Sequence, residues 1–314
     1  MKKAVISYRH SENLGDYIQT LAAEQYLSGD ITRFDRDTLH LEPENEYKLL
    51  INGWFMEKPH NWPPHPKFKP LFLSFHLNPT AEKQMLNPEG VAYLKKHQPI
   101  GCRDKHTLKR LESHGIEAYF TACLTLGLSL PTANSKQTKK APILVVSAFE
   151  RLANMGKALD SKSKGVFQQL KAVYNRYRYE KAQQRLNTFL SRIENEVVYK
   201  SQIVTAKNIT NETLFQLAQS QLEAIAAARL VITSRIHTAL PAVALGIPVV
   251  FLTDGLEHPN QKSRLEGMTS FFTCINSKEF KSLQWEQLVA TEKHRPFVEK
   301  MQSEISSFFK DMAD

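Results

Sequence analysis

The segment LVITSRIHTALPAVALGIPVVF, residues 230–251, contains side chains that can bind an anion and move a proton. Ser234, Arg235 and His237 directly follow an apolar run typical of a buried strand, and they open a helix that ends at Gly246. Ligands of open α/β sheets bind beyond the carboxyl ends of strands, and a helix N-terminus attracts phosphate or carboxylate. Arg235 would add a fork of N–H donors, and His237 a group that titrates near neutral pH. These residues predict an anion-binding active site.

The same pair has an ordinary structural interpretation. Arg235 would then pair with a carboxylate, and His237 would be a satisfied core histidine. Because both side chains lie at one strand end, we favour the functional interpretation.

The turn HSENLGD follows the first apolar run, residues 4–8, in the same way. Asn13 and Asp16 suit a helix N-cap, and Gly15 permits close approach of another group to the backbone. Gln19 lies one turn into the predicted helix. Capping alone would also explain this turn, so by itself it is a weak sign of a site.

A second guanidinium group follows another short strand, in the sequence IGCRD. Arg103 and Asp104 stand between this strand and a predicted helix. An isolated Arg-Asp pair is common and weak, so Arg103 gains meaning only if the fold brings it to Arg235.

Other sequence patterns give weaker evidence for a function. Residues 35–37 read Asp-Arg-Asp, a motif that some glycosyltransferases use to hold a metal and a nucleotide sugar, but the surrounding scaffold does not match. No Gly-x-Gly-x-x-Gly, no Gly-x-x-x-x-Gly-Lys-Ser/Thr and no zinc-ligand spacing is present. We therefore expect no cofactor and no metal. The three cysteines are too scattered for a disulfide framework, and we expect free structural thiols.

The elements that must position these residues alternate between strand and helix patterns, which predicts an α/β fold with two doubly wound, Rossmann-like domains facing a cleft. We expect an N-terminal domain over residues 1–135 and a C-terminal domain over residues 141–290. The last segment, 291–314, would be a helix that packs back on the first domain. Between the domains, the polar, basic stretch 131–140 reads as a linker. Predicted strands cover residues 4–8, 31–34, 48–54, 71–75, 117–126, 142–147, 197–204, 230–233 and 248–251; predicted helices cover 17–27, 88–97, 105–115, 211–228 and 236–245.

The net charge of +9 is concentrated in one section. Residues 151–200 contain eleven Lys or Arg against four Asp or Glu, a net +7. Such a section attracts phosphates of nucleic acid, of anionic lipid or of a lipid-linked diphosphate; the alternative is a solvated helix face. No signal peptide or membrane span is apparent, so we expect a cytoplasmic protein that can lie at the inner face of the membrane.

The chain resembles the polysaccharide pyruvyl transferase family. Four segments carry the resemblance in family order: NLGDYIQTLA, LLINGWF, IGCRDKHTLKRLESHGIEAYFTACLTL and ARLVITSRIHTALPAVALGIPVVFL. The basic section 151–200 has no counterpart. The resemblance implies a fold like that of GT-B glycosyltransferases and transfer of the enolpyruvyl group of phosphoenolpyruvate to a sugar, with closure of a ketal and release of phosphate.

The resemblance also implies roles for individual residues. Arg103, Arg235 and His237 fall on positions associated with the phosphoenolpyruvate site, whose carboxylate and phosphate suit two guanidinium groups. We expect His237 to supply a proton and Asp16 to act as base toward the sugar hydroxyl. The predicted catalytic residues are His237, Arg103 and Asp16; the predicted substrate-binding residues are Arg235, Ser234, Thr238, Asn13, Gly15, Gln19 and Asn52.

Two other functions remain open. A glycosyltransferase that uses a nucleotide sugar would fit the same scaffold. A noncatalytic protein could instead bind nucleic acid or membrane through the +7 section. We favour the pyruvyl transferase, with phosphoenolpyruvate as donor, a glycan or lipid-linked sugar as acceptor, peripheral membrane contact through residues 151–200 and no nucleic acid partner.

Overall fold

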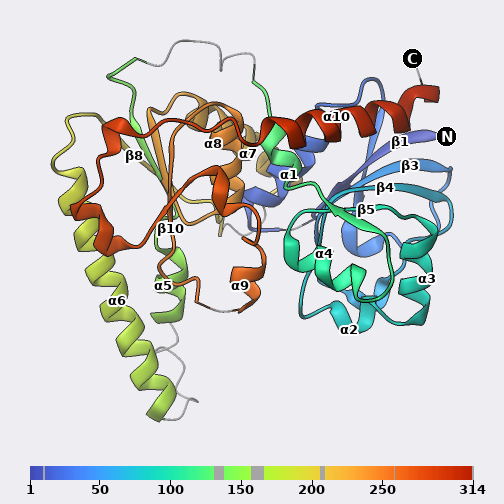
Figure 1. Ribbon diagram of the computed structural model, residues 1–314, viewed down its shortest axis with the longest axis horizontal. Coiled ribbons are helices and arrows are strands. Elements are labelled where there is room, and N and C mark those ends of the chain that lie inside the picture. The colour runs from blue at the N-terminus through green and yellow to red at the C-terminus, as the bar shows by residue number, and fades with distance from the viewer. Residues whose placement is uncertain (10, 131–137, 157–165, 206–208, 258, 313–314) are drawn as a thin grey trace.

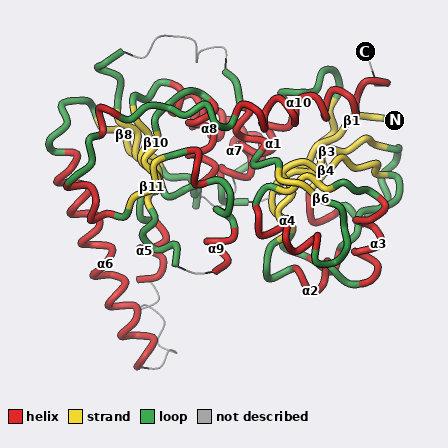
Figure 2. The backbone as a smooth tube through the Cα atoms, viewed as in Figure 1, coloured by secondary structure: helices red, strands yellow, loops and turns green. Residues whose placement is uncertain are grey.

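The computed structural model describes residues 1–9, 11–130, 138–156, 166–205, 209–257 and 259–312. Its strands form two separate sheets, and every pairing between named strands is parallel (Figures 1 and 2). The predicted α/β class with two Rossmann-like sheets is confirmed. Most of the predicted linker, residues 131–137, lies outside the described residues.

The first sheet has six strands in the order β2-β1-β3-β4-β5-β6. Alternate residues point to opposite faces, and each face has its own apolar core. Ala4 and Ile6 of β1 join one core, whereas Val5 joins the other. Burial on both faces explains why these strands read as continuous apolar runs. The strands are β1 (Lys2–Ser7), β2 (Ile31–Asp35), β3 (Tyr47–Phe55), β4 (Phe68–Leu77), β5 (Ile100–Cys102) and β6 (Ala118–Phe120).

The second sheet has five strands in the order β11-β10-β9-β7-β8. Its two faces are covered by different helices. Leu144 and Val231 pack in the core that α7 and α8 cover, whereas Val145 and Ile232 pack in the core that includes α6. The strands are β7 (Ile143–Val146), β8 (Val197–Lys200), β9 (Leu230–Thr233), β10 (Val249–Leu252) and β11 (Thr273–Ile275).

The helices of the described part of the chain surround the two sheets (Figure 1). None of them combines the length and the apolar character that crossing a bilayer would need. They are α1 (Leu14–Glu24), α2 (Glu82–Met85), α3 (Pro88–Lys96), α4 (Lys105–Glu112), α5 (Glu150–Gly156), α6 (Val166–Leu190), α7 (Asn211–Ala226), α8 (Ile236–Ala244), α9 (Pro259–Ser263) and α10 (Arg295–Phe309).

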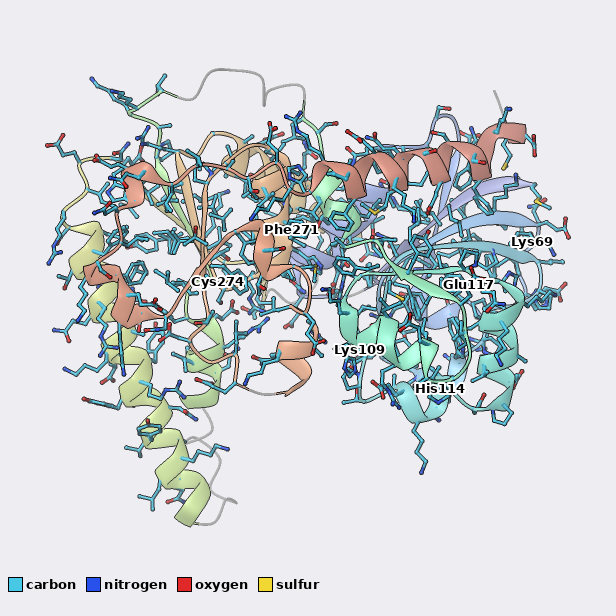
Figure 3. All side chains as sticks on the ribbon, in the orientation of Figure 1. Lys69, Lys109, His114, Glu117, Phe271 and Cys274 are labelled. Atoms are coloured by element: carbon cyan, nitrogen blue, oxygen red, sulfur yellow. The ribbon has the colours of Figure 1, made fainter. Side chains whose placement is uncertain are left out.

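The two sheets are joined through apolar packing of helix α1. Leu14, Tyr17 and Ile18 of this helix belong to the core under α7 and α8 of the second sheet. The ring of Tyr17 meets that of Phe215 edge-on, with centroids 5.0 Å apart. Farther along the junction, Phe271 contacts Phe297 of α10 at 5.7 Å (Figure 3). The first turn of α1 is thereby brought to the start of α8.

Helix α10 returns from the second sheet to the first (Figure 1). Met301 and Ile305 are buried against Val5, Leu50 and Leu73 of β1, β3 and β4. The last helix therefore covers one face of the first sheet.

Several element boundaries differ from the sequence-based predictions; the strand predicted over residues 197–204, for example, ends at Lys200. Helix α1 begins at Leu14, three residues before the predicted start, because the side chain of Asn13 accepts a hydrogen bond from the Gly15 N–H and caps it. The strand predicted over residues 117–126 ends at Phe120 and is followed by a 3₁₀ helix, Leu124–Gly127. That prediction was wrong because Ala122 adopts a positive φ of 57°, which an extended strand cannot contain.

Candidate anion-binding site

The turns before α1 and α8 lie against each other. A Cβ atom placed on Gly15 would stand 2.9 Å from Cβ of His237, so only a glycine allows this approach. Gln202, from the loop after β8, joins the two turns: its Nε2 donates to Asn13 Oδ1 at 2.8 Å, and its Oε1 accepts from Thr238 Oγ1 at 2.6 Å. The fold thus brings together residues that are more than two hundred positions apart in the sequence.

Arg103, at the end of β5, is buried to 2% exposure. Its backbone N–H donates to the Phe75 carbonyl at 2.8 Å, and its Nη1 donates to Gln19 Oε1 at 3.3 Å. Its Nε has no hydrogen-bond partner within the described residues and lies 4.0 Å from Asp104 Oδ2. A buried guanidinium group with an unused donor favours an anion as its missing partner.

Three more guanidinium groups lie within electrostatic reach of one another. Burial and the charges of Arg235 and Arg264 lower the pKa of Arg151 to about 9. Burial and the charge of Arg103 lower the pKa of Arg264 to about 10. We call Arg103, Arg151, Arg235 and Arg264 the arginine cluster. Its members come from four different segments of the chain: the ends of β5 and β9, the start of α5 and the segment after α9.

Three carboxylates oppose the four positive charges of the cluster: Glu150, Asp104 and Asp16. Arg235 Nη2 lies 2.7 Å from Glu150 Oε2, so this arginine does have the carboxylate partner of the structural interpretation. Its Nε nevertheless stays unpaired in the described part of the protein, as does that of Arg264. The positive charge of the cluster suits a ligand that carries both a carboxylate and a phosphate.

His237 is almost fully buried, at 6% exposure, and its Nε2 has no hydrogen-bond partner among the described side chains. It is therefore not the satisfied core histidine of the structural interpretation. Burial, and then the charges of Arg103 and Arg264, hold its pKa well below the usual value for histidine. The ring is neutral at neutral pH, and an anion bound at the cluster would raise its proton affinity.

A buried His-Asp pair lies beside Arg103. His76 Nδ1 is 2.5 Å from Asp104 Oδ2, and both side chains are at 0% exposure. Burial lowers the pKa of His76 to about 4, against the opposing charge of Asp104. Burial alone would raise the pKa of Asp104, but contact with His76 and the charge of Arg103 hold it lowered. The pair is therefore a carboxylate with a neutral imidazole that donates from Nδ1.

Asp16 is buried at the start of α1, and both of its oxygens are engaged. Ser11 Oγ donates to Oδ2 at 2.6 Å, and Gln19 Nε2 approaches Oδ1 at 3.3 Å. Burial raises its pKa, and the Ser11 hydrogen bond and the charges of Arg36 and Arg264 act in the opposite direction.

Several of the predicted substrate-binding side chains are held in hydrogen bonds of the scaffold. Ser234 Oγ donates to the Ser147 carbonyl at 2.8 Å, and Asn52 Nδ2 donates to the Gln19 carbonyl at 2.9 Å. Asn13 and Thr238 are engaged with Gln202. Asn52 Oδ1 is still unpartnered within the described residues. These four side chains fix the positions of the strand ends and helix starts around the cluster.

Sequence reasoning missed four residues of this region: Arg151, Arg264, His76 and Gln202. The rule that polar residues after apolar strands form sites could have found His76, which ends the run LFLSFH, and Arg151, which follows PILVVSAFE. Arg264 stands in a segment without a periodic apolar pattern, so no local signal marks it. Gln202 lies within the strand predicted over residues 197–204, and because the strand ends at Lys200, the loop that carries Gln202 was not predicted.

Comparison with known proteins identifies the family of the chain. The family model for polysaccharide pyruvyl transferases matches residues 13–254, which include Arg103, Arg235 and His237. No curated protein matches the chain. A crystal structure of a functionally uncharacterised protein from Klebsiella pneumoniae subsp. pneumoniae NTUH-K2044 is 14% identical, with a TM-score of 0.46 over 88% of this chain and 93% of that one. On the match over residues 13–254, the chain belongs to the polysaccharide pyruvyl transferase family and is a transferase.

Proposed function

We propose that this transferase moves the enolpyruvyl group of phosphoenolpyruvate to a sugar of a surface polysaccharide or of its lipid-linked precursor, forming a pyruvate ketal. The observation that supports the donor is the arginine cluster: three of its four members have a buried Nε without a hydrogen bond, as has Nε2 of His237, within the described residues. Phosphoenolpyruvate carries three negative charges on a carboxylate and a phosphate when fully ionised, which matches these donors.

The reaction balances with protons that the acceptor supplies. Two sugar hydroxyl groups form two C–O bonds to C2 of the enolpyruvyl group, and the C2–O bond to phosphate breaks. One hydroxyl proton ends on the methylene carbon, which becomes a methyl group, and the other leaves with phosphate. His237 is the proposed donor to the methylene carbon or to the departing phosphate, because bound phosphoenolpyruvate offsets the arginine charges that lower its pKa. Asp16 is the proposed base toward a hydroxyl group.

The reaction is proposed to take place in the cytoplasm, at the inner face of the membrane. The support for membrane contact is the net charge of +7 in residues 151–200, since anionic lipid headgroups attract such a section. The lipid-linked form of the acceptor would be presented there.

The test is incubation of the purified protein with phosphoenolpyruvate and candidate glycosides, followed by measurement of phosphate release and detection of the ketal. Arg103→Ala and His237→Ala should each lower the rate by roughly 100-fold or more. Arg192→Ala, at an exposed arginine after α6, is the matched control and should keep full activity. Full activity of either site variant would contradict the residue roles.

Thermal unfolding of the purified protein distinguishes the pyruvyl transferase from the main alternative, a glycosyltransferase. A ligand that binds only the folded state raises the unfolding temperature. Phosphoenolpyruvate should protect the protein and a nucleoside diphosphate should not. The reverse result would indicate a glycosyltransferase that uses a nucleotide sugar.

A further inference from the structure

The first half of helix α6 extends beyond the rest of the molecule (Figures 1 and 3). Its second half is anchored, since Ala182, Leu186 and Phe189 are buried in the core of the second sheet. The extending half has its own apolar surface. Leu170, Val173, Tyr174 and Tyr177 are exposed to between 53% and 63%.

These four residues form a stripe because their spacing is i, i+3, i+4 and i+7, which places them on one face of a helix. The opposite side is occupied: Ala172 and Asn175 are buried, and α6 packs against α5. Exposed large apolar side chains that line up along one helix are unusual on a protein surface and mark an interaction site. We call them the α6 stripe.

Cationic side chains border the α6 stripe. Lys171, Arg178, Lys181, Arg185 and Lys278 line an open groove of about 1100 Å³ between α6 and the ends of β10 and β11. The two carboxylates of the groove are already engaged, Glu257 by Arg178 and Asp254 by Ser277. The groove therefore keeps a net positive charge of three, from five cations and two anions.

We propose that the α6 stripe and its bordering lysines dock on an anionic lipid surface. Aliphatic and tyrosine side chains flanked by Lys and Arg are the composition of a helix that lies in the membrane interface. A protein partner or a second copy would have no need for the excess of cations, whereas a lipid bilayer with anionic headgroups complements it. This deepens the proposed function, because α5, which packs on α6, carries Glu150 and Arg151 of the site. Docking would hold the site near a lipid-linked acceptor.

The experiment is cosedimentation of the full chain with vesicles of phosphatidylglycerol and phosphatidylcholine, compared with vesicles of phosphatidylcholine alone. The wild-type protein should bind the anionic vesicles and be released by salt. Lys171→Glu with Lys181→Glu should weaken binding at least roughly 25-fold, since each surface lysine contributes about fivefold in affinity.

The stripe is tested by replacing Leu170, Val173, Tyr174 and Tyr177 together with Ser. This variant should lose the binding that persists at high salt. The matched control replaces Leu41, Tyr199 and Val289 with Ser, because these apolar residues are equally exposed elsewhere on the surface. Equal binding of the stripe variant and the control would overturn the proposal, as would binding to neutral vesicles alone.

Size-exclusion chromatography tests whether a second copy of the protein, in place of a membrane, covers the α6 stripe. A wild-type dimer that becomes a monomer only in the stripe variant would show that a second copy covers the stripe, which also overturns the proposal. Because no measurement here depends on turnover, a failure of docking is distinct from a failure of the proposed pyruvyl transfer.

The His76–Asp104 pair carries a second, independent inference. Asp104 is held in place twice: Oδ2 contacts His76, and Oδ1 caps α4 by accepting from the Thr107 N–H at 2.8 Å. The carboxylate therefore keeps the Nδ1–H tautomer of His76 and leaves a lone pair on Nε2, which has no partner within the described residues. His76 stands at the end of β4, one residue after Phe75, whose carbonyl accepts from the Arg103 N–H.

We infer that His76 is the base that accepts the proton of an acceptor hydroxyl group. In this step the O–H bond breaks, the proton moves to Nε2, and the oxygen pair forms the C–O bond to C2 of the enolpyruvyl group. The methylene carbon takes a proton from His237 as its double bond to C2 is lost, and the C2–O bond to phosphate breaks when the second hydroxyl group attacks C2. The assignment rests on the proposed pyruvyl transfer, and it competes with Asp16, whose two oxygens are already engaged.

Three variants test it: His76→Gln, Asp104→Asn and Asp16→Asn. His76→Gln should lower kcat roughly 100-fold or more while the affinity for phosphoenolpyruvate, measured by thermal shift, changes less than threefold. Asp104→Asn keeps the cap of α4 but no longer selects the tautomer, so it should lower kcat at least about tenfold.

Each result decides between the two bases. A kcat of His76→Gln within threefold of the wild-type value overturns the assignment, and a large loss in Asp16→Asn alone gives the role to Asp16. A wild-type protein that forms no ketal at all would overturn the proposed function together with this assignment. Unfolding temperature of each variant shows whether the fold is intact.

Discussion

Single residues of the arginine cluster keep buried N–H donors that no hydrogen bond of the described residues uses. A buried guanidinium group normally needs a carboxylate or several hydrogen bonds to offset the loss of water. Arg103 has one side-chain hydrogen bond, to Gln19, and Nε of Arg264 has no partner in the described structure. The energetic cost of this arrangement is recovered when an anion binds, which is why the cluster is informative about function.

Arg264 is the most direct test at this scale, because it lies outside the residues that match the family model. Arg264→Ala should weaken the affinity for phosphoenolpyruvate roughly 10- to 100-fold, the range for a lost charged hydrogen bond. The affinity can be measured by isothermal titration calorimetry, with Arg192→Ala as the control. Unchanged affinity would remove Arg264 from the site.

The pH dependence of stability is a second prediction for single residues. The pKa of His76 is about 4 in the folded protein, below the usual histidine value near 6.5. The unfolded chain therefore binds a proton that the folded protein does not, so stability is complete above about pH 6.5 and falls as pH decreases toward 4. His76 contributes up to about 3 kcal/mol to this loss.

The contribution is isolated by comparing urea unfolding of the wild type and of His76→Gln at several pH values. His237 changes stability with the same sign, and Asp16, whose pKa is raised, with the opposite sign. The difference between the two proteins reports His76 together with Asp104, whose pKa the contact with His76 lowers. A constant difference between pH 6.5 and 4 would contradict the lowered pKa.

Among the elements, the contact between the starts of α1 and α8 positions the site. Gly15 is the point of closest approach, and Gln202 joins both helix starts by hydrogen bonds. In this contact Asn13 Oδ1 and Thr238 Oγ1 are both held by Gln202. They hold the two turns in register. The fixed turns in turn set the positions of Arg235 and His237 at the start of α8.

Gly15→Ala tests this contact. The added Cβ would meet Gln202 Nε2 at 2.5 Å and His237 Cβ at 2.9 Å, which should destabilise the protein by about 1–3 kcal/mol and lower the affinity for phosphoenolpyruvate. Gly246→Ala is the contrasting variant, since its φ is +74° with nothing within 4 Å of an added Cβ. It should cost stability of about 1–2 kcal/mol through backbone strain and leave the affinity unchanged.

In the whole molecule, helix α10 links the end of the chain to the first sheet. Its buried residues Met301 and Ile305 share a core with β1, β3 and β4. Phe297 of the same helix contacts both Phe120 of β6 and Phe271, which lies just before β11 of the second sheet. The helix therefore stabilises the junction that holds the arginine cluster together.

Ile305→Ala should lower the free energy of unfolding by about 2–5 kcal/mol, because it leaves a cavity against the first sheet. Ser306→Ala, at an exposed neighbouring position, should change it by less than about 0.5 kcal/mol. Denaturant unfolding measures both. A similar value for the two variants would show that α10 does not support the first sheet.

The sequence by itself determined the α/β class, the position of most strands and the strand-end turns that carry Arg103, Arg235 and His237. These features follow from local apolar patterns, because a strand buried on both faces must be continuously apolar and its polar residues must begin where it ends. The same local logic extended the strand at residues 117–126 too far, since nothing in the residue types announces the positive φ of Ala122.

Only the tertiary structure decided which charged side chains lie close to one another. Arg264 reaches the site from a segment without a periodic pattern, and Gln202 from a loop that the sequence predicts as strand. Only the fold places Arg151 near Arg235 and His76 beside Asp104. The pKa values of the histidines likewise depend on burial and on charges from distant parts of the chain. Electrostatic interaction depends on distance in space, which packing of the whole chain sets and which no local pattern of residues contains.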